Sequence, residues 1–137
     1  ALEAWGAQIA FGRVAIRPGK PLLVARRGAQ WIIGLPGNPV SSYVTAVLFL
    51  LPLLRALAGA ADPLPGVLHL PLAAPLPAAG TRAEFVRARL TADGVLPADQ
   101  QDSSALLSLA RSDALIRRPV GSSAAAAGEM VAVHLLA

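Results

Sequence analysis

The spacing of apolar and polar positions divides the chain into two parts. In the first part, short apolar runs predict three strands, at residues 9–16, 21–26 and 30–35. Residues 1–10 are expected to contain the end of a helix. Residues 40–58 are apolar around more than half of a helical circumference, which predicts a helix covered on more than one side. Pro52 should kink this helix, and Gly59 should cap its C-terminus.

Residues 60–66, with one aspartate, two prolines and a glycine, mark the predicted boundary between two domains, 1–62 and 63–137. The second domain contains short strand candidates at residues 67–74, 82–90, 95–97, 114–117 and 129–136. Asp93-Gly94 is typical of a hairpin turn. Residues 103–110 predict a short serine-capped helix or turn, and residues 122–128 a mobile loop. Short strands separated by glycine and proline predict a small sheet or half-open barrel.

The turn before the long helix reads Gly-Leu-Pro-Gly-Asn-Pro-Val-Ser-Ser at residues 34–42. Pro39 suits the first turn of a helix, and Asn38 can cap the amides that follow it. Ser41 adds a hydroxyl close to the helix start. A strand, a tight turn and a helix N-terminus together favour an anion. For this turn taken alone, a well-capped structural connection is the more frequent case.

A second turn, residues 16–21, reads Ile-Arg-Pro-Gly-Lys-Pro and carries a cation on each side of its glycine. Lys20 is the only lysine, whereas the other basic residues are arginines. An ammonium is a compact charge that can meet a phosphate or another oxyanion, which gives one reason to retain it. The alternative is a solvated lysine in an exposed turn.

Composition and charge exclude several kinds of site. The net charge is +4, but the arginines are scattered and only 4% of residues are aromatic, which argues against nucleic-acid binding. There is no cysteine, and His69 and His134 lack metal-ligand spacing. Asp99 and Asp102 are the nearest carboxylate candidates for a divalent metal and are interpreted as loop residues. No signal-peptide pattern is present, and residues 44–54 are shorter than the ~20 apolar residues of a membrane span. A soluble, cytoplasmic protein is expected.

The two turns, in this order and spacing, resemble the C-terminal part of the MoeA-type molybdopterin molybdenumtransferases, which include the E domain of gephyrin. The second half of the chain is similar to the C-terminal β domain of that family, in three looser stretches at residues 84–88, 101–110 and 127–131. The resemblance covers essentially the whole chain. It implies an α/β plus all-β fold: the C-terminal half of a molybdopterin-binding (MogA-like) α/β domain, followed by a small β-barrel-like domain.

The resemblance also implies a function. A full-length parent would insert molybdate into adenylylated molybdopterin, releasing AMP, and the fragment alone would be inactive. Lys20 is the candidate catalytic residue, and the candidate substrate-binding residues are Arg17, Lys20, Gly37, Asn38 and Ser41. Arg17 stands where the family often has lysine. Mg²⁺ would be bound mainly by an N-terminal part that has no counterpart here.

The implied partners are a second copy of the full-length chain and the molybdopterin adenylyltransferase, with no nucleic acid and no membrane. The alternative is a non-catalytic dimerisation or interaction module with a vestigial anion site. The apolar helix of residues 44–54 supports this alternative, because half an α/β domain leaves an apolar face uncovered.

Overall fold

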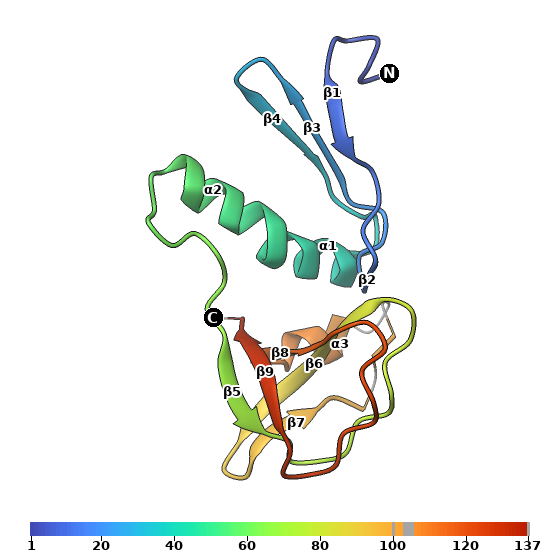
Figure 1. The fold of residues 1–137 in the computed structure, drawn as a ribbon, viewed down its shortest axis with the longest axis vertical. Helices are drawn as coiled ribbons and strands as arrows, with labels where there is room; N and C mark the ends of the chain where they lie inside the picture. Colours follow the sequence, from blue (N-terminus) through green and yellow to red (C-terminus); the bar gives the residue numbers. More distant parts are fainter. Residues whose placement is uncertain (100, 103–105, 137) are drawn as a thin grey trace.

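The computed structural model describes residues 1–99, 101–102 and 106–136. Figure 1 shows an N-terminal sheet, a long helix beside it and a second sheet on the other side of that helix. The elements follow in the order β1 (Gln8–Phe11), β2 (Ile16–Arg17), β3 (Leu23–Arg27), β4 (Gln30–Gly34), α1 (Pro39–Thr45), η1 (Ala46–Leu50), α2 (Leu51–Leu57), β5 (Leu68–Pro71), β6 (Ala83–Thr91), β7 (Gly94–Pro97), α3 (Leu106–Ala110), β8 (Ala114–Arg118) and β9 (Met130–Leu135).

The first sheet has the order β1-β3-β4 and is antiparallel. Its β3–β4 hairpin turns at Gly28, whose φ of 57° lies in the left-handed region that glycine adopts without strain. Together with the helix of residues 39–57, this sheet is called the helix–hairpin region below. The predicted strands at residues 21–26 and 30–35 are confirmed, with shifts of one or two residues at their ends.

The long helix is continuous, but its middle turn is a π-helix at η1. There the amide of Leu51 donates to the carbonyl of Ala46, directly before Pro52. Proline lacks an amide proton, and the wider turn accommodates the missing hydrogen bond at Pro52. At the C-terminus, Gly59 has a φ of 84°, and Ala60 donates to Arg55 at 3.0 Å. The predicted glycine cap is therefore confirmed as a Schellman motif.

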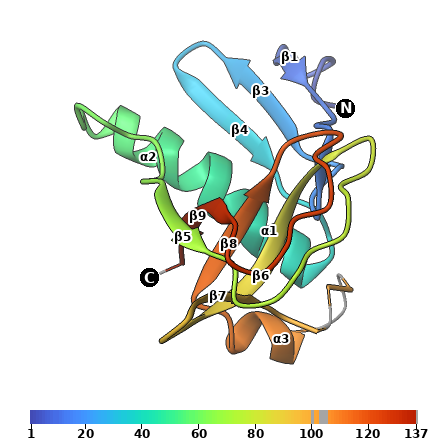
Figure 2. The same cartoon turned by 60° about the horizontal axis from the view of Figure 1, so that its bottom comes forward.

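The second sheet, called the β region here, has the order β2-β6-β8-β9-β5, with β7 also paired to β6. Leu72, just after β5, bridges to Val95 in β7, so the two ends of the sheet approach each other as in a barrel. Figure 2 shows α3 at the lower edge of these strands. Their inward side chains form one buried apolar cluster, made of Leu72, Leu76, Val86, Ala88, Val95, Ala114, Ile116, Ala125, Val131 and Val133.

Two predictions for the N-terminal segment are wrong. Residues 9–16 do not form one strand: β1 ends at Phe11, and the chain crosses to the other sheet, where β2 pairs in parallel with β6. The residues before β1 form hydrogen-bonded turns instead of a helix end, and Gly6, with a φ of 85°, closes them. The short parallel pairing of β2 ties the first part of the chain to the β region.

Two further details concern loops. The alanine-rich stretch of residues 122–128 is fastened to the β region, because Ala125 and Leu76 exchange two backbone hydrogen bonds of 2.9 Å. The hairpin turn at Asp93-Gly94 is confirmed between β6 and β7. Helix α3 covers the end of the predicted helix, but its predicted serine cap lies outside the described residues.

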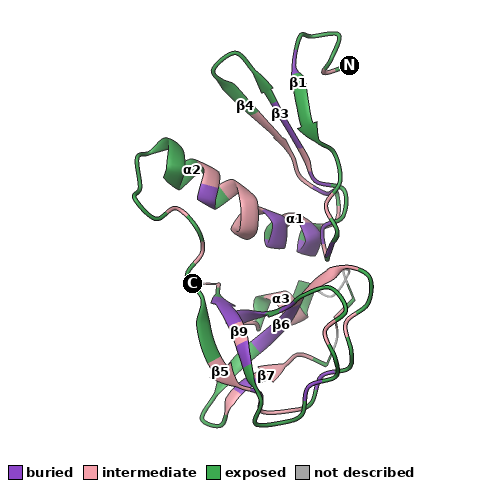
Figure 3. Ribbon diagram, viewed as in Figure 1, coloured by how far each residue is buried: buried purple, intermediate pink, exposed green. Residues whose placement is uncertain are grey.

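Burial differs along the long helix (Figure 3). Val40, Ser41, Val44 and Thr45 in α1 are buried, whereas Pro52 is the one buried residue of α2. The helix Pro39–Leu57 is long and apolar enough to cross a membrane by length and composition, and 28% of its apolar window is buried in the fold. Its capped and buried N-terminal half packs as part of a folded protein. Its C-terminal half leaves leucines exposed.

Candidate functional site

The turn after β2 is held tightly by its own backbone. The carbonyl of Lys20 accepts from the amide of Val14 at 3.0 Å and from that of Leu22 at 3.1 Å. Gly19 is buried and has a φ of 113°, a conformation that other residues rarely adopt. Lys20 itself is exposed. The turn therefore presents its one ammonium group from a fixed backbone.

This turn packs directly on helix α1. A Cβ atom at Gly19 would collide with the methyl group of Thr45. Thr45 is fully buried, and its hydroxyl donates to the Ser41 carbonyl at 2.8 Å. Glycine is thus required at this position, and the sequence motif of residues 16–21 exists in part because the turn must approach the helix closely.

The start of α1 is capped as predicted. The side-chain Oδ1 of Asn38 accepts from the amide of Val40 at 3.0 Å and from that of Ser41 at 3.2 Å. Pro39 has no amide proton to offer. These first-turn amides are therefore occupied by the cap, and the hydroxyl is the group that Ser41 is expected to offer to an anion. Ser41 is also 7% exposed.

Gly37 lies just before this cap and is exposed. A Cβ atom built on Gly37 meets nothing within 4 Å, so neither packing nor a positive φ demands glycine there. Among the described residues, the amides of Gly37 and Asn38 have no hydrogen-bond partner. These two amides are the groups of the turn that remain available to a ligand.

Arg17 forms an ion pair with a residue of β6. Its Nη1 atom lies 3.8 Å from Oε1 of Glu84, and its side chain is 58% exposed. Arg17 lines a cavity of about 300 Å³ at the edge of the β region, together with Glu84 and Arg118. Lys20 does not line this cavity. The structure thus places the two basic residues of the motif at two neighbouring but different positions.

A polar centre around Arg87 was not predicted from the sequence. Arg87 is only 1% exposed, and its Nη2 donates to the Asp102 carbonyl at 2.8 Å. The side chain of Gln101 brackets its backbone, accepting from the Arg87 amide at 3.0 Å and donating to its carbonyl at 2.9 Å. Burial lowers the pKa of the Arg87 guanidinium, and the carboxylate of Asp102 acts in the opposite direction.

The signal that could have found this centre was weak. Arg87 and Arg89 alternate with apolar residues in β6, a pattern that usually indicates a solvated strand face. Arg89 is exposed, but Arg87 is buried under the chain that follows β7. Alternation assigns residues to a face, and it does not tell whether another segment covers that face.

Within the described parts of the chain, no group of three or more histidine, aspartate, glutamate or cysteine side chains could hold a metal ion. Asp102 contributes its carbonyl to Arg87. His134 donates from Nδ1 to the carbonyl of Gly66 at 3.0 Å. The donor set in these residues therefore does not fit a magnesium ion.

The comparisons with known proteins agree with this architecture. Residues 69–136 match the family model described as MoeA C-terminal region (domain IV). A molybdopterin molybdenumtransferase of Synechococcus elongatus is 43% identical over 99% of this chain and 34% of its own length. The chain belongs to the MoeA family. The molybdenum cofactor synthesis protein cinnamon of Drosophila melanogaster is 40% identical over 98% of this chain and 24% of its own length.

Solved MoeA structures share the fold across both regions. The molybdopterin biosynthesis MoeA protein of Pyrococcus horikoshii superposes with a TM-score of 0.77 at 28% identity, covering 94% of this chain and 32% of that one. A molybdenum cofactor biosynthesis protein of Pyrococcus furiosus gives 0.79 at 27% identity, covering 93% and 45%. The chain spans about a third of the length of the curated relative from Synechococcus. The coarse fold, a mixed α/β part followed by a β part, is thus confirmed.

Proposed function

We propose that this chain is part of a longer enzyme that inserts molybdenum into molybdopterin during molybdenum cofactor biosynthesis. The observation that carries the proposal is the match to molybdopterin molybdenumtransferases over nearly the whole chain, a stretch that includes the turns at residues 16–21 and 34–42. The structure is compatible with it locally, since Gly19 packs against Thr45 of α1 and the turn that carries Lys20 therefore lies against the same helix that Asn38 caps.

In this proposal, Lys20 binds the oxyanion. Its ammonium group neutralises negative charge on molybdate or on the pterin phosphate, while its backbone stays fixed by the bonds from Val14 and Leu22. The free amides of Gly37 and Asn38 contact the same ligand as hydrogen-bond donors, and Ser41 supports the helix start from within. Arg17 adds positive charge from the β-region side.

The finer parts of the proposal come from the family resemblance. The substrate would be adenylylated molybdopterin, delivered by the molybdopterin adenylyltransferase, and AMP would leave as molybdenum is inserted. A parent homodimer in the cytoplasm would carry out the reaction, with Mg²⁺ held outside the residues described here. On its own, the 137-residue chain is expected to be inactive.

A second candidate function is an interaction module. A shallow cavity of about 300 Å³ runs between β4 and the C-terminal half of the helix and is lined by apolar residues, among them Trp31, Leu54 and Leu57. Trp31, Leu54 and Leu57 are exposed in this chain. A surface of this kind is typical of a docking or dimerisation site.

The test of the enzymatic proposal is AMP release by the full-length parent, supplied with adenylylated molybdopterin and molybdate. Lys20→Ala should lower the rate by about 10²-fold or more, since it removes a charge that stabilises the reacting oxyanion. Arg55→Ala, an exposed cation at the end of α2, is the matched control and should leave the rate unchanged. Equal rates for the wild type and Lys20→Ala would contradict the proposal and favour the interaction module.

A further inference from the structure

Three charged side chains form a row across three neighbouring strands of the β region. Arg17 on β2 is in parallel register with Glu84 on β6, and Glu84 is in antiparallel register with Arg118 on β8. Opposed residues on adjacent strands place their side chains close together on one face. The row contains two cations and one carboxylate, so it keeps one net positive charge.

All three side chains line the same cavity of about 300 Å³. Its other walls are mainly apolar, contributed by Leu76, Pro77, Ala78, Phe85 and Val86 among others. A cavity of this size holds a phosphate-sized group with room for part of an attached organic moiety. The arrangement of a few charged groups in an apolar pocket is typical of a small-molecule site.

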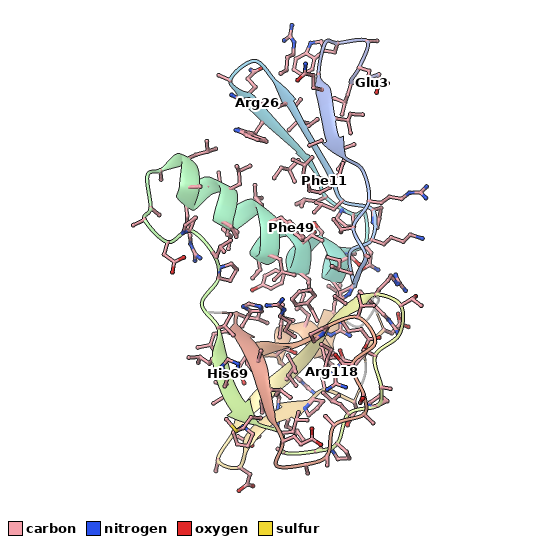
Figure 4. All side chains as sticks on the ribbon, in the orientation of Figure 1. Glu3, Phe11, Arg26, Phe49, His69 and Arg118 are labelled. Atoms are coloured by element: carbon pink, nitrogen blue, oxygen red, sulfur yellow. The ribbon has the colours of Figure 1, made fainter. Side chains whose placement is uncertain are left out.

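Arg118 is the most buried cation of this row. It is only 6% exposed, and Figure 4 labels it within the β region. Its Nη2 donates to two neutral acceptors, the carbonyls of Pro77 at 3.2 Å and of Ser123. Among the described residues, no carboxylate oxygen lies within 4.0 Å of its guanidinium nitrogens, because Glu84 approaches Arg17 instead. A buried cation without a counter-charge is costly, and an anion in the cavity would offset that cost.

We propose that this cavity is a second anion site, which binds a tetrahedral oxyanion between Arg118 and Arg17. The preferred ligand is the phosphate group of a phosphomonoester, whose organic part contacts the apolar wall. Molybdate shares the same tetrahedral chemistry. The nature of the ligand rests on the proposed function, whereas the anion site rests on the row itself. Glu84 lowers the affinity for the anion, since its carboxylate pairs with Arg17 and repels the anion.

The test measures binding of two probes, inorganic phosphate and molybdate, to the full-length parent by calorimetry at low ionic strength. Arg17→Gln removes a cation and should weaken binding by about three- to tenfold, whereas Glu84→Gln removes the repelling charge and should strengthen it by a similar factor. Arg118→Gln should abolish it. Arg111→Gln, which removes an exposed arginine outside this cavity, is the control and should have no effect.

The two probes distinguish the sources of the anion. If the substitutions in the row change the affinity for phosphate, the cavity is a phosphate subsite. If they change the affinity for molybdate alone, the cavity is a molybdate position. If Arg118→Gln fails to fold, the opposite shifts of Arg17→Gln and Glu84→Gln still test the site. The inference would be overturned if Lys20→Ala lowered the affinity for both probes while Arg17→Gln, Glu84→Gln and Arg118→Gln left it unchanged. That result would leave the enzymatic proposal intact.

Discussion

The β region and the helix–hairpin region bury their apolar residues in different ways. In the β region, the sheet curls so that its inward side chains meet one another, and Val95, Ile116 and Val133 are fully buried. In the helix–hairpin region, one sheet and one helix share a single contact layer, and Leu54 and Leu57 remain 51% and 61% exposed. Closure of a sheet on itself thus gives a self-sufficient core, whereas a single layer leaves an apolar surface that further protein can cover.

The largest expected difference in stability between the two regions comes from truncating one apolar side chain in each. Ile116→Ala should lower the free energy of unfolding by about 2–5 kcal/mol, because it leaves a cavity in the closed core. Leu54→Ala should change it by less than about 0.5 kcal/mol, because the leucine is half exposed. Denaturant unfolding of the 137-residue chain measures both. Equal losses would show that the two regions are packed alike.

The next comparison uses a glycine of the β region and the glycine of the turn that packs on α1. Gly94 has a φ of 122°, and a Cβ atom there would collide with the Pro71 carbonyl, so Gly94→Ala should cost more than about 2 kcal/mol. Gly19→Ala should also destabilise the chain, though less than Gly94→Ala, because the colliding atom is a side-chain methyl of the buried Thr45 and not a backbone carbonyl. Gly66→Ala meets nothing within 4 Å and is the control for thermal unfolding. A Gly94→Ala chain as stable as Gly66→Ala would refute the β6–β7 geometry.

Removing a side chain that hydrogen-bonds to the backbone should give a smaller difference in stability between the two regions. Gln101→Ala should destabilise the β region by about 1–3 kcal/mol, since it removes both side-chain hydrogen bonds to the backbone of Arg87. Asn38→Ala should cost about 1 kcal/mol, the usual effect of a lost N-cap, and Asn38→Asp should restore most of it. Chemical unfolding monitored by circular dichroism can rank the two. The reverse order would mean that the helix–hairpin region depends on its cap more than the β region depends on Gln101.

The smallest expected effect concerns the ion pair between strands β2 and β6. A double-mutant cycle of Arg17→Gln and Glu84→Gln should give a coupling energy below about 1 kcal/mol, because the pair is 3.8 Å apart and partly exposed. The coupling should fall further as salt is added. A larger, salt-insensitive coupling would show that this contact, and not the backbone pairing alone, holds β2 against β6.

Local features of the fold could be predicted from the sequence. The hairpin turn at Asp93-Gly94, the cap at Asn38 and the end of the helix at Gly59 all depend on residues within a few positions. The strand β2 could not be predicted, because two residues give no periodic pattern and its partner β6 is far away in the sequence. Its pairing decides where Arg17 points.

The candidate site was predictable only in part. The two turns are visible as sequence motifs, and the structure places one of them against α1 through Gly19. Arg87 and Arg118 could not be distinguished from solvated strand residues, because their burial comes from segments that cross over the strands. The cap also occupies the amide of Ser41, so the exposed ammonium of Lys20 and the amides of Gly37 and Asn38 remain as the predicted ligand groups.

The most direct test of the anion site at this turn is to locate molybdenum in crystals of the full-length parent soaked with molybdate, using the anomalous scattering of the metal. We expect a molybdenum position with oxygens in contact with the Lys20 ammonium and the amides of Gly37 and Asn38, absent from crystals of Lys20→Ala. Molybdenum bound away from both turns, or bound equally in the variant, would contradict this assignment.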